Sequence, residues 1–274
     1  MSQYVQDFYD QNANHEWQRL DTPLSKIEFT SALWLINKYF PKQGSVCDIG
    51  SGPGRYAIEL IRKGYSVTLF DLSKASIQLA QAKLAELNLQ AQAFIVGDAK
   101  EDMQQLSAES FDCALLMGPM YHTVDAVDRL QTLRQVSRIL KPKGLALITY
   151  LNAWGLLRTG FSDFPSWYQD ISILRSMVSE HTFLGSSLSN FTECYWSTPE
   201  IAIKEVESAG FEVITYAGAQ GFAGGMRPIL EQLAKENPEA YENIVQVAAE
   251  MCELKPYRDS TEHIHLVVQK KGTS

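Results

Sequence analysis

The sequence has few cysteines and no pattern that would give them a joint role. Cys47, Cys113, Cys194 and Cys252 lie far apart in a chain of 274 residues, with no C-x-x-C pair and no Cys/His cluster at the spacing of a zinc site. A disulfide framework and a metal site are therefore not expected. We predict four reduced thiols, the first two on buried strands.

Long apolar runs are missing as well. No apolar window reaches the length of about 18 residues that a membrane span needs. Residues 1–20 mix glutamine, aspartate, asparagine, histidine, glutamate and arginine, so they contain no apolar core of a signal peptide. We expect a cytoplasmic protein with no membrane partner.

Positive charge is also scarce. The formal net charge is −8 with a pI near 5.2, and the longest basic run is Lys270-Lys271. A general attraction to the phosphate backbone of nucleic acids is therefore not supported, and no nucleic-acid partner is predicted. A local basic patch stays open.

What the chain has in quantity is a regular alternation of apolar strands and amphipathic helices. The composition, 45% hydrophobic and 20% charged, is that of one large globular domain with insertions. Strands alternating with sheet-facing helices predict an α/β fold, a doubly wound, Rossmann-like, mostly parallel sheet with helices on both faces. The seven predicted strands are 45–49, 66–70, 93–96, 112–117, 145–151, 211–217 and 263–269.

The first strand-helix-strand unit, Val46 to Asp71, carries the strongest ligand signal. Gly50 and Gly52 follow an apolar run, where glycines allow a sharp turn and a close approach of ligand to the main chain, and a helix start then offers free N–H groups. Asp71 ends the next strand about 20 residues on, where a carboxylate meets the hydroxyls of a ribose. We predict a ligand with an adenosine-like sugar.

A dinucleotide fingerprint would need a third glycine where this chain has Arg55; Gly54 gives G-x-G-x-G instead. The stretch D-I-G-S-G-P-G-R-Y, followed by F-D-L-S, resembles motif I and the acidic loop of class I S-adenosylmethionine-dependent methyltransferases. Further matches fall in the order of that family. They are Gly97-Asp98-Ala99, Phe111-Asp112, Met117-Gly118-Pro119-Met120-Tyr121-His122 and Leu140-Lys141-Pro142-Lys143-Gly144-Leu145.

The resemblance implies S-adenosylmethionine as the cofactor. Asp71 would accept the ribose hydroxyls, and Asp98, with Ala99 beside it, the adenine amino group. The backbone of the glycine loop and of the fourth-strand tip would hold the methionine portion. The further positions implied at the cofactor are Asp48, Gly50, Ser51, Gly52, Leu72 and Met117.

Residues 1–20 are too aromatic for a free tail. Their F-Y-D and E-W-Q-R-L elements resemble the entry segment of ubiquinone- and menaquinone-biosynthesis methyltransferases, which folds over the cofactor. The resemblance implies that Tyr9 and Arg19 lie near the methionine carboxylate. Alternatively, the aromatic side chains cover a sheet edge and Arg19 is solvated.

We expect a single methyltransferase domain over residues 1–274. It would comprise an N-terminal cap (1–30), a cofactor-binding core (31–150), an aromatic lid insertion (151–196) and the C-terminal part of the sheet (197–274), with a helical insertion at 218–258. The lid would cover the acceptor pocket, or else form a dimer contact or a satellite core. The resemblance implies an antiparallel last strand, although about 45 intervening residues exclude a tight hairpin with the strand before it. The 218–258 insertion would be a pocket wall or an oligomer face, and a homodimer stays open.

Methyl transfer from a sulfonium needs alignment and exclusion of water rather than a metal or a covalent nucleophile. His122, at the tip of the fourth strand, has a suitable pKa for taking a proton from a hydroxyl acceptor, and Tyr121 could orient that acceptor. A histidine here can equally be a capping or packing residue, and a neutral amine acceptor needs only positioning.

The same tip indicates the substrate class. It lacks the Asn/Asp-Pro-Pro-aromatic motif of nucleic-acid amino-methyltransferases, and the nearest cysteine, Cys113, lies inside the strand rather than after it. We predict methyl transfer to an O, N or C atom of a small molecule by direct in-line displacement. The alternatives are a nicotinamide-dependent reductase and a non-catalytic S-adenosylmethionine-binding protein.

Overall fold

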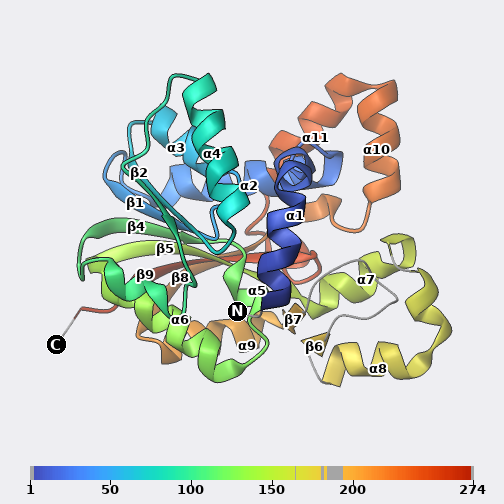
Figure 1. The fold of residues 1–274 in the computed structure, drawn as a ribbon. Helices are drawn as coiled ribbons and strands as arrows, with labels where there is room; N and C mark the ends of the chain where they lie inside the picture. The colour runs from blue at the N-terminus through green and yellow to red at the C-terminus, as the bar shows by residue number, and fades with distance from the viewer. Residues whose placement is uncertain (1–2, 164, 180–181, 184–193, 273–274) are drawn as a thin grey trace.

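A computed structural model of the protein describes residues 3–163, 165–179, 182–183 and 194–272 (Figure 1). The strands are β1 (Ser45–Ile49), β2 (Ser66–Asp71), β3 (Ala93–Val96), β4 (Phe111–Leu116), β5 (Leu140–Asn152), β6 (Thr182–Phe183), β7 (Cys194–Ser197), β8 (Phe211–Gly218) and β9 (His263–Lys270). The helices are α1 (Gln3–Arg19), α2 (Pro23–Tyr39), α3 (Arg55–Arg62), α4 (Lys74–Glu86), α5 (Pro119–His122), α6 (Ala126–Ile139), α7 (Ala153–Asp163), α8 (Ile171–Ser179), α9 (Pro199–Ser208), α10 (Arg227–Glu236), α11 (Pro238–Glu250) and α12 (Lys255–Arg258), with 3-10 turns η1 (Asp102–Gln105), η2 (Pro165–Gln169) and η3 (Gly221–Ala223).

The seven predicted strands form one sheet in the order β3-β2-β1-β4-β5-β9-β8. β1 to β5 are parallel, and β9 is antiparallel to both β5 and β8, as predicted. The 218–258 insertion separates β8 from β9 in sequence, yet the two strands pair along most of their length. The strand order reverses between β1 and β4, and parallel sheets bind ligands outside the carboxyl ends of strands at such a point.

The described part of the sheet contains two strands more than the seven predicted. β7 pairs with β5 through only two residues of that strand, Leu151 and Asn152, which lie beyond the end of β4. β6 then pairs with β7 through two residues. Strands this short inside an aromatic insertion leave no alternating pattern to predict them from.

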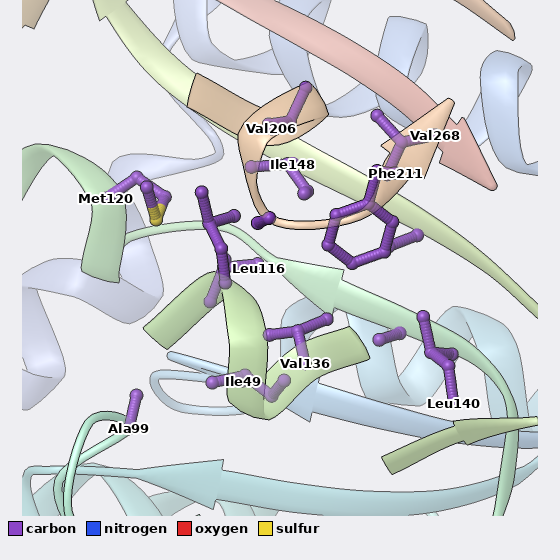
Figure 2. Close-up of a cluster of buried hydrophobic side chains, with 14 of the residues drawn as sticks. Ile49, Ala99, Leu116, Met120, Val136, Leu140, Ile148, Val206, Phe211 and Val268 are labelled. Carbon is purple, nitrogen blue, oxygen red and sulfur yellow. The ribbon is translucent and has the colours of Figure 1, made fainter. Parts of the chain in front are cut away.

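Two apolar layers cover the two faces of the sheet, because successive side chains of a strand point to opposite sides. Along β1, Val46 packs with α2, α3 and α4, whereas Ile49 packs toward α6 and α9. β4 repeats the pattern with Leu115 and Leu116. Figure 2 shows the α6 and α9 side, where Ile49, Leu116 and Ile148 converge with Phe211.

The two insertions build smaller cores of their own. α10 and α11 pack on α2, where Leu24 and Ile27 meet Leu230 and Tyr241. α7, η2 and α8 enclose a cluster around Trp167 and Trp196 at the end of β5. In Figure 1 both units lie to the right of the strands, next to α1, with α10 and α11 above α7 and α8.

The four cysteines are buried thiols, with Cys47 on β1 and Cys113 on β4, as predicted. Among the described residues, no helix is both long enough and apolar enough to span a bilayer.

Candidate functional site

A cavity opens at the carboxyl ends of β1, β2, β3 and β4, beneath α1. All the predicted site residues except Asp48 and Asp98 line it. They are Tyr9, Arg19, Gly50, Ser51, Gly52, Asp71, Leu72, Ala99, Met117, Tyr121 and His122. Residues separated by more than 100 positions therefore share one wall.

The glycine loop forms the floor of this cavity, and its backbone needs glycine. Gly50 has φ +74°, and an added Cβ would lie 2.6 Å from Cδ of Pro119, so the β1 and β4 tips touch here. Gly52 has φ +52°, and an added Cβ would meet no atom within 4 Å. The loop therefore turns sharply at Gly50 and presents bare main chain to the cavity at Gly52.

Asp71 is held rigidly at the end of β2. Its Oδ2 accepts a hydrogen bond from the Gly52 amide and its Oδ1 one from the Ser73 amide, both at 2.7 Å. Burial raises the pKa of Asp71 to about 6, although these two N–H donors lower it. A carboxylate has about four lone-pair sites, so two remain for hydroxyl donors from a ligand.

Asp48 lies behind the loop rather than in the cavity wall. It is 1% exposed, and neither carboxylate oxygen has a hydrogen-bond partner among the described residues. Burial, followed by the negative charge of Asp71, raises the pKa of Asp48 to about 7. A buried carboxylate in this state favours a positive charge nearby.

Asp98 is also absent from the cavity wall, although its neighbours Gly97 and Ala99 line it. Its Oδ1 accepts a hydrogen bond from the Lys100 amide at 2.7 Å, which forms a tight turn after β3. Its predicted contact with an adenine amino group stays a prediction.

Helix α1 covers the cavity and is tied to both of its ends. Asp10 accepts hydrogen bonds from Ser73 Oγ (2.7 Å) and the Ala75 amide (3.1 Å), so it caps α4 from outside that helix. At the other end, the Tyr9 hydroxyl lies 2.7 Å from Nε2 of His122. Long-range contacts of this kind have no signature in the sequence.

The Tyr9–His122 pair lies at the tip of β4, with His122 buried and Tyr9 partly buried. His122 is 4% exposed, and burial raises the pKa of the Tyr9 hydroxyl well above its ordinary value, so this phenol keeps its proton near neutral pH. Tyr121 packs against the imidazole with ring centroids 4.7 Å apart, and burial raises the pKa of its hydroxyl as well. The pair can relay a proton away from the cavity.

Sequence reasoning missed several lining residues, among them Val5, Glu16, Tyr56 and Pro119. Glu16 belongs to the E-W-Q-R-L element, and it binds Nε of Arg19 at 2.7 Å. The E-W-Q-R-L element could therefore have predicted Glu16 as a site residue. The apolar members have no local signal, because only the fold turns them toward the cavity.

The described part of the predicted aromatic lid lies outside this wall. None of the described residues between 151 and 196, or between 218 and 258, lines the cavity. Residues 164, 180–181 and 184–193 of the predicted lid lie outside the described part of the chain. The link between the lid segment and the cavity is Tyr121, which packs on the Trp167 cluster. The lid function stays a prediction.

Comparisons with known proteins find a methyltransferase domain in this chain. Residues 46–144 match a family model described as "Methyltransferase domain". The tRNA 5-carboxymethoxyuridine methyltransferase of Escherichia coli (strain K12) is 24% identical over 93% of this chain and 86% of its own length. The ubiquinone biosynthesis O-methyltransferase of Caulobacter vibrioides is 32% identical over 39% of this chain and 41% of its own length.

Solved structures show the same fold. An S-adenosylmethionine-dependent methyltransferase from Methanosarcina mazei superposes with a TM-score of 0.59 at 18% identity, covering 87% of this chain and 98% of its own. One from Mesorhizobium loti gives a TM-score of 0.58 at 14% identity, with 88% and 98% covered.

The chain is a class I S-adenosylmethionine-dependent methyltransferase. S-adenosylmethionine is its cofactor, and the nicotinamide-dependent alternative is set aside. Among the described residues, no three His, Cys, Asp or Glu side chains are grouped as metal ligands.

Proposed function

We propose that this enzyme transfers the methyl group to an oxygen atom of a small organic acceptor, with the Tyr9–His122 pair taking the acceptor proton. The observation that carries the proposal is the 2.7 Å contact between the Tyr9 hydroxyl and His122 Nε2 in the wall of the cofactor cavity. It joins an imidazole nitrogen, which can accept a proton, to a hydroxyl on the covering helix.

The chain's own residues fit the cofactor. Asp71 offers free lone pairs for the ribose hydroxyls, and the open face of Gly52 leaves room for the ligand beside the main chain. The buried charge of Asp48 favours a cationic ligand, since no described residue bonds to its oxygens. Arg19, whose Nε is bonded to Glu16, suits the methionine carboxylate.

When bound, S-adenosylmethionine would supply a methyl group from its sulfonium, and its sulfur would keep the electron pair of the bond that breaks. The acceptor oxygen would take the methyl group and release its proton to the oxygen of Tyr9, while the Tyr9 proton would move to Nε2 of His122. The high pKa of Tyr9 makes a persistent phenolate unfavourable, so both protons move together. Alignment of acceptor and methyl group can supply about 7–11 kcal/mol of the barrier.

Three observations support a small acceptor. The cavity lies beneath α1, which contributes Val5, Tyr9, Glu16 and Arg19 to its wall. The net charge of −8 gives no general attraction to a polyanion. The β4 tip carries Met117 and Gly118 where nucleic-acid amino-methyltransferases carry a polar acceptor side chain.

A radiolabelled methyl-transfer assay over phenols, other hydroxyl acceptors, carboxylic acids and amines tests the proposal. We expect turnover of a hydroxyl acceptor that falls about 100-fold in His122→Ala, because general-base catalysis contributes 10²–10⁴-fold. The matched control is His15→Ala, on α1 but with a largely exposed side chain. Full turnover of hydroxyl acceptors by His122→Ala would remove the proton relay.

A second candidate acceptor is a tRNA nucleoside with a carboxylate. It is favoured because the similarity to the tRNA 5-carboxymethoxyuridine methyltransferase extends over 93% of this chain, insertions included. A carboxylate is already ionised near pH 7, so it needs no base. Methylation of bulk tRNA that survives His122→Ala and weakens steeply with salt would favour this candidate over the first.

A further inference from the structure

The guanidinium of Arg129 lies buried directly behind the loop that carries Tyr121 and His122. Arg129 belongs to α6 and is 4% exposed. Its NH1 donates hydrogen bonds to the carbonyl oxygens of Thr123 (3.0 Å) and Val124 (2.6 Å), the two residues that follow His122.

The loop depends on such donors. α5 is a single turn that ends at His122, and Thr123 leaves the helix with φ −106° and ψ 98°. The last carbonyls of a helix have no partners within it, and those buried without partners cost free energy. Arg129 supplies the partners beyond α5, while Thr123 Oγ1 bonds back to the carbonyl of Pro119 at 2.8 Å.

Three further elements hold the guanidinium itself. Its Nε donates to Oε1 of Glu205 on α9 at 2.9 Å, and Oε2 of the same carboxylate accepts a hydrogen bond from the Tyr150 hydroxyl on β5 at 2.8 Å. The ring of Tyr195 on β7 lies flat against it, 3.4 Å from ring centroid to Cζ. β7 thus joins the lid segment to the loop that carries His122.

We propose that Arg129 is a positioning residue for His122, and that Tyr195 makes the lid segment part of the same support. Arg129, Glu205 and Tyr195 are called the clamp below. The proposal deepens the proposed function, because it concerns the residue that takes the acceptor proton there. A fixed carbonyl pair at residues 123 and 124 fixes the end of α5, and with it the distance from His122 Nε2 to Tyr9. A misplacement of about 1 Å at a reacting group can cost about 100-fold in rate.

Arg129→Lys tests this role, since lysine keeps the charge but not the planar fork of donors. Arg138→Lys is the matched control: Arg138 lies on the same helix and also binds two carbonyls, those of Leu106 and Met103, far from His122. The first readout is the ¹⁵N shift of the His122 imidazole by NMR. The second is turnover, and the third is the Kd of S-adenosylhomocysteine by calorimetry.

We expect Arg129→Lys to move the ¹⁵N shifts of His122 and lower turnover about tenfold or more, with Kd unchanged, while Arg138→Lys changes none of the three. In the double variant with His122→Ala, turnover should fall no further than in His122→Ala alone, because residues that act as a unit are not additive. Unmoved shifts, or losses that add in full, overturn the proposal. Normal turnover in His122→Ala alone refutes the proposed relay, whereas the NMR readout still decides whether Arg129 fixes His122.

Arg129→Lys leaves buried carbonyl oxygens after His122 with fewer donors, so this variant could fail to fold. Tyr195→Leu then carries the test, since it removes the aromatic face without leaving a charge unpaired, and Tyr195→Phe is its control because phenylalanine keeps that face. We expect the leucine variant alone to move the His122 shifts and lower turnover. Equal behaviour of the two variants overturns the role of Tyr195, and normal His122 shifts in Tyr195→Leu overturn the clamp.

Discussion

Replacing Asp48 by asparagine should stabilise the cofactor-free protein at neutral pH and weaken its binding of S-adenosylmethionine. Asp48 is 1% exposed, and its oxygens lack hydrogen-bond partners among the described residues. Burial and the charge of Asp71 raise its pKa from 3.8 to about 7. Each unit corresponds to about 1.4 kcal/mol, so keeping Asp48 ionised in the fold costs about 4 kcal/mol.

The sign follows from proton linkage. The pKa of Asp48 is higher in the folded state than in the unfolded state, so the folded state binds this proton more tightly. The contribution of Asp48 to the stability of the wild-type protein therefore falls as pH rises from about 4 to about 7. The asparagine of the variant does not titrate. Its unpaired amide has a burial cost of its own, about 1–3 kcal/mol, but that cost does not change with pH. The difference in unfolding free energy, variant minus wild type, should therefore rise by about 1.4 kcal/mol per pH unit between pH 5 and 7 and level off above.

Urea unfolding followed by circular dichroism between pH 4.5 and 8 measures this difference. Asp71 titrates in both proteins, so its contribution cancels to first order. Asp112→Asn is the control without a pH trend in this range. Bonds from Lys141 and Ser45 lower the pKa of Asp112 despite its burial, so its ionised form already stabilises the fold above about pH 4, and the difference for this variant should be negative and flat from pH 4.5 to 8. If the difference in unfolding free energy between Asp48→Asn and the wild type stays constant from pH 5 to 8, Asp48 does not carry a costly buried charge, and the prediction is wrong.

Three further results are expected. The Kd of S-adenosylhomocysteine by calorimetry should rise about tenfold per pH unit below pH 6 and be constant above, since Asp71, with its pKa of about 6, must be ionised to accept two hydroxyl donors; a flat profile would contradict this. Asp10→Ala should lower stability by about 1 kcal/mol and speed cofactor release in stopped-flow fluorescence, because α4 loses the acceptor of Ser73 Oγ, whereas Asp10→Asn keeps an acceptor and should retain most of the wild-type behaviour. Leu116→Ala, fully buried, should lower the unfolding free energy by about 2–5 kcal/mol in urea titration without changing cofactor affinity, whereas Val127→Ala, at an exposed position, should change neither.

The parallel sheet was predictable because its signals are local. A short apolar run such as 66–70 is stable only as a buried strand. The sharp turn after β1 requires glycine whatever the rest of the chain does. The position of Asp71 follows from the same unit, so its place in the cavity wall could be predicted from the sequence alone. The strand boundaries moved by a few residues at most, except that β5 begins at Leu140 rather than Leu145.

The acceptor end could not be predicted in the same way, because its contacts join distant parts of the chain. Tyr9 meets His122 across 113 positions. The aromatic content of residues 151–196 indicated a lid, yet Trp167 and Trp196 pack with each other and with β5 instead of lining the cavity. Aromatic composition indicates burial but not the partner, since packing of a satellite core and cover of a ligand require the same residue types.

The division of the cavity wall explains why similarity identifies the cofactor more sharply than the acceptor. The matched methyltransferase region, residues 46–144, contains Gly52, Asp71 and His122, but Tyr9 lies on α1, outside that region. The proposed proton relay thus combines one residue inside the matched region with one outside it. The match over residues 46–144 therefore supports the cofactor, whereas the proposed acceptor chemistry depends on α1 and on the contacts that hold His122.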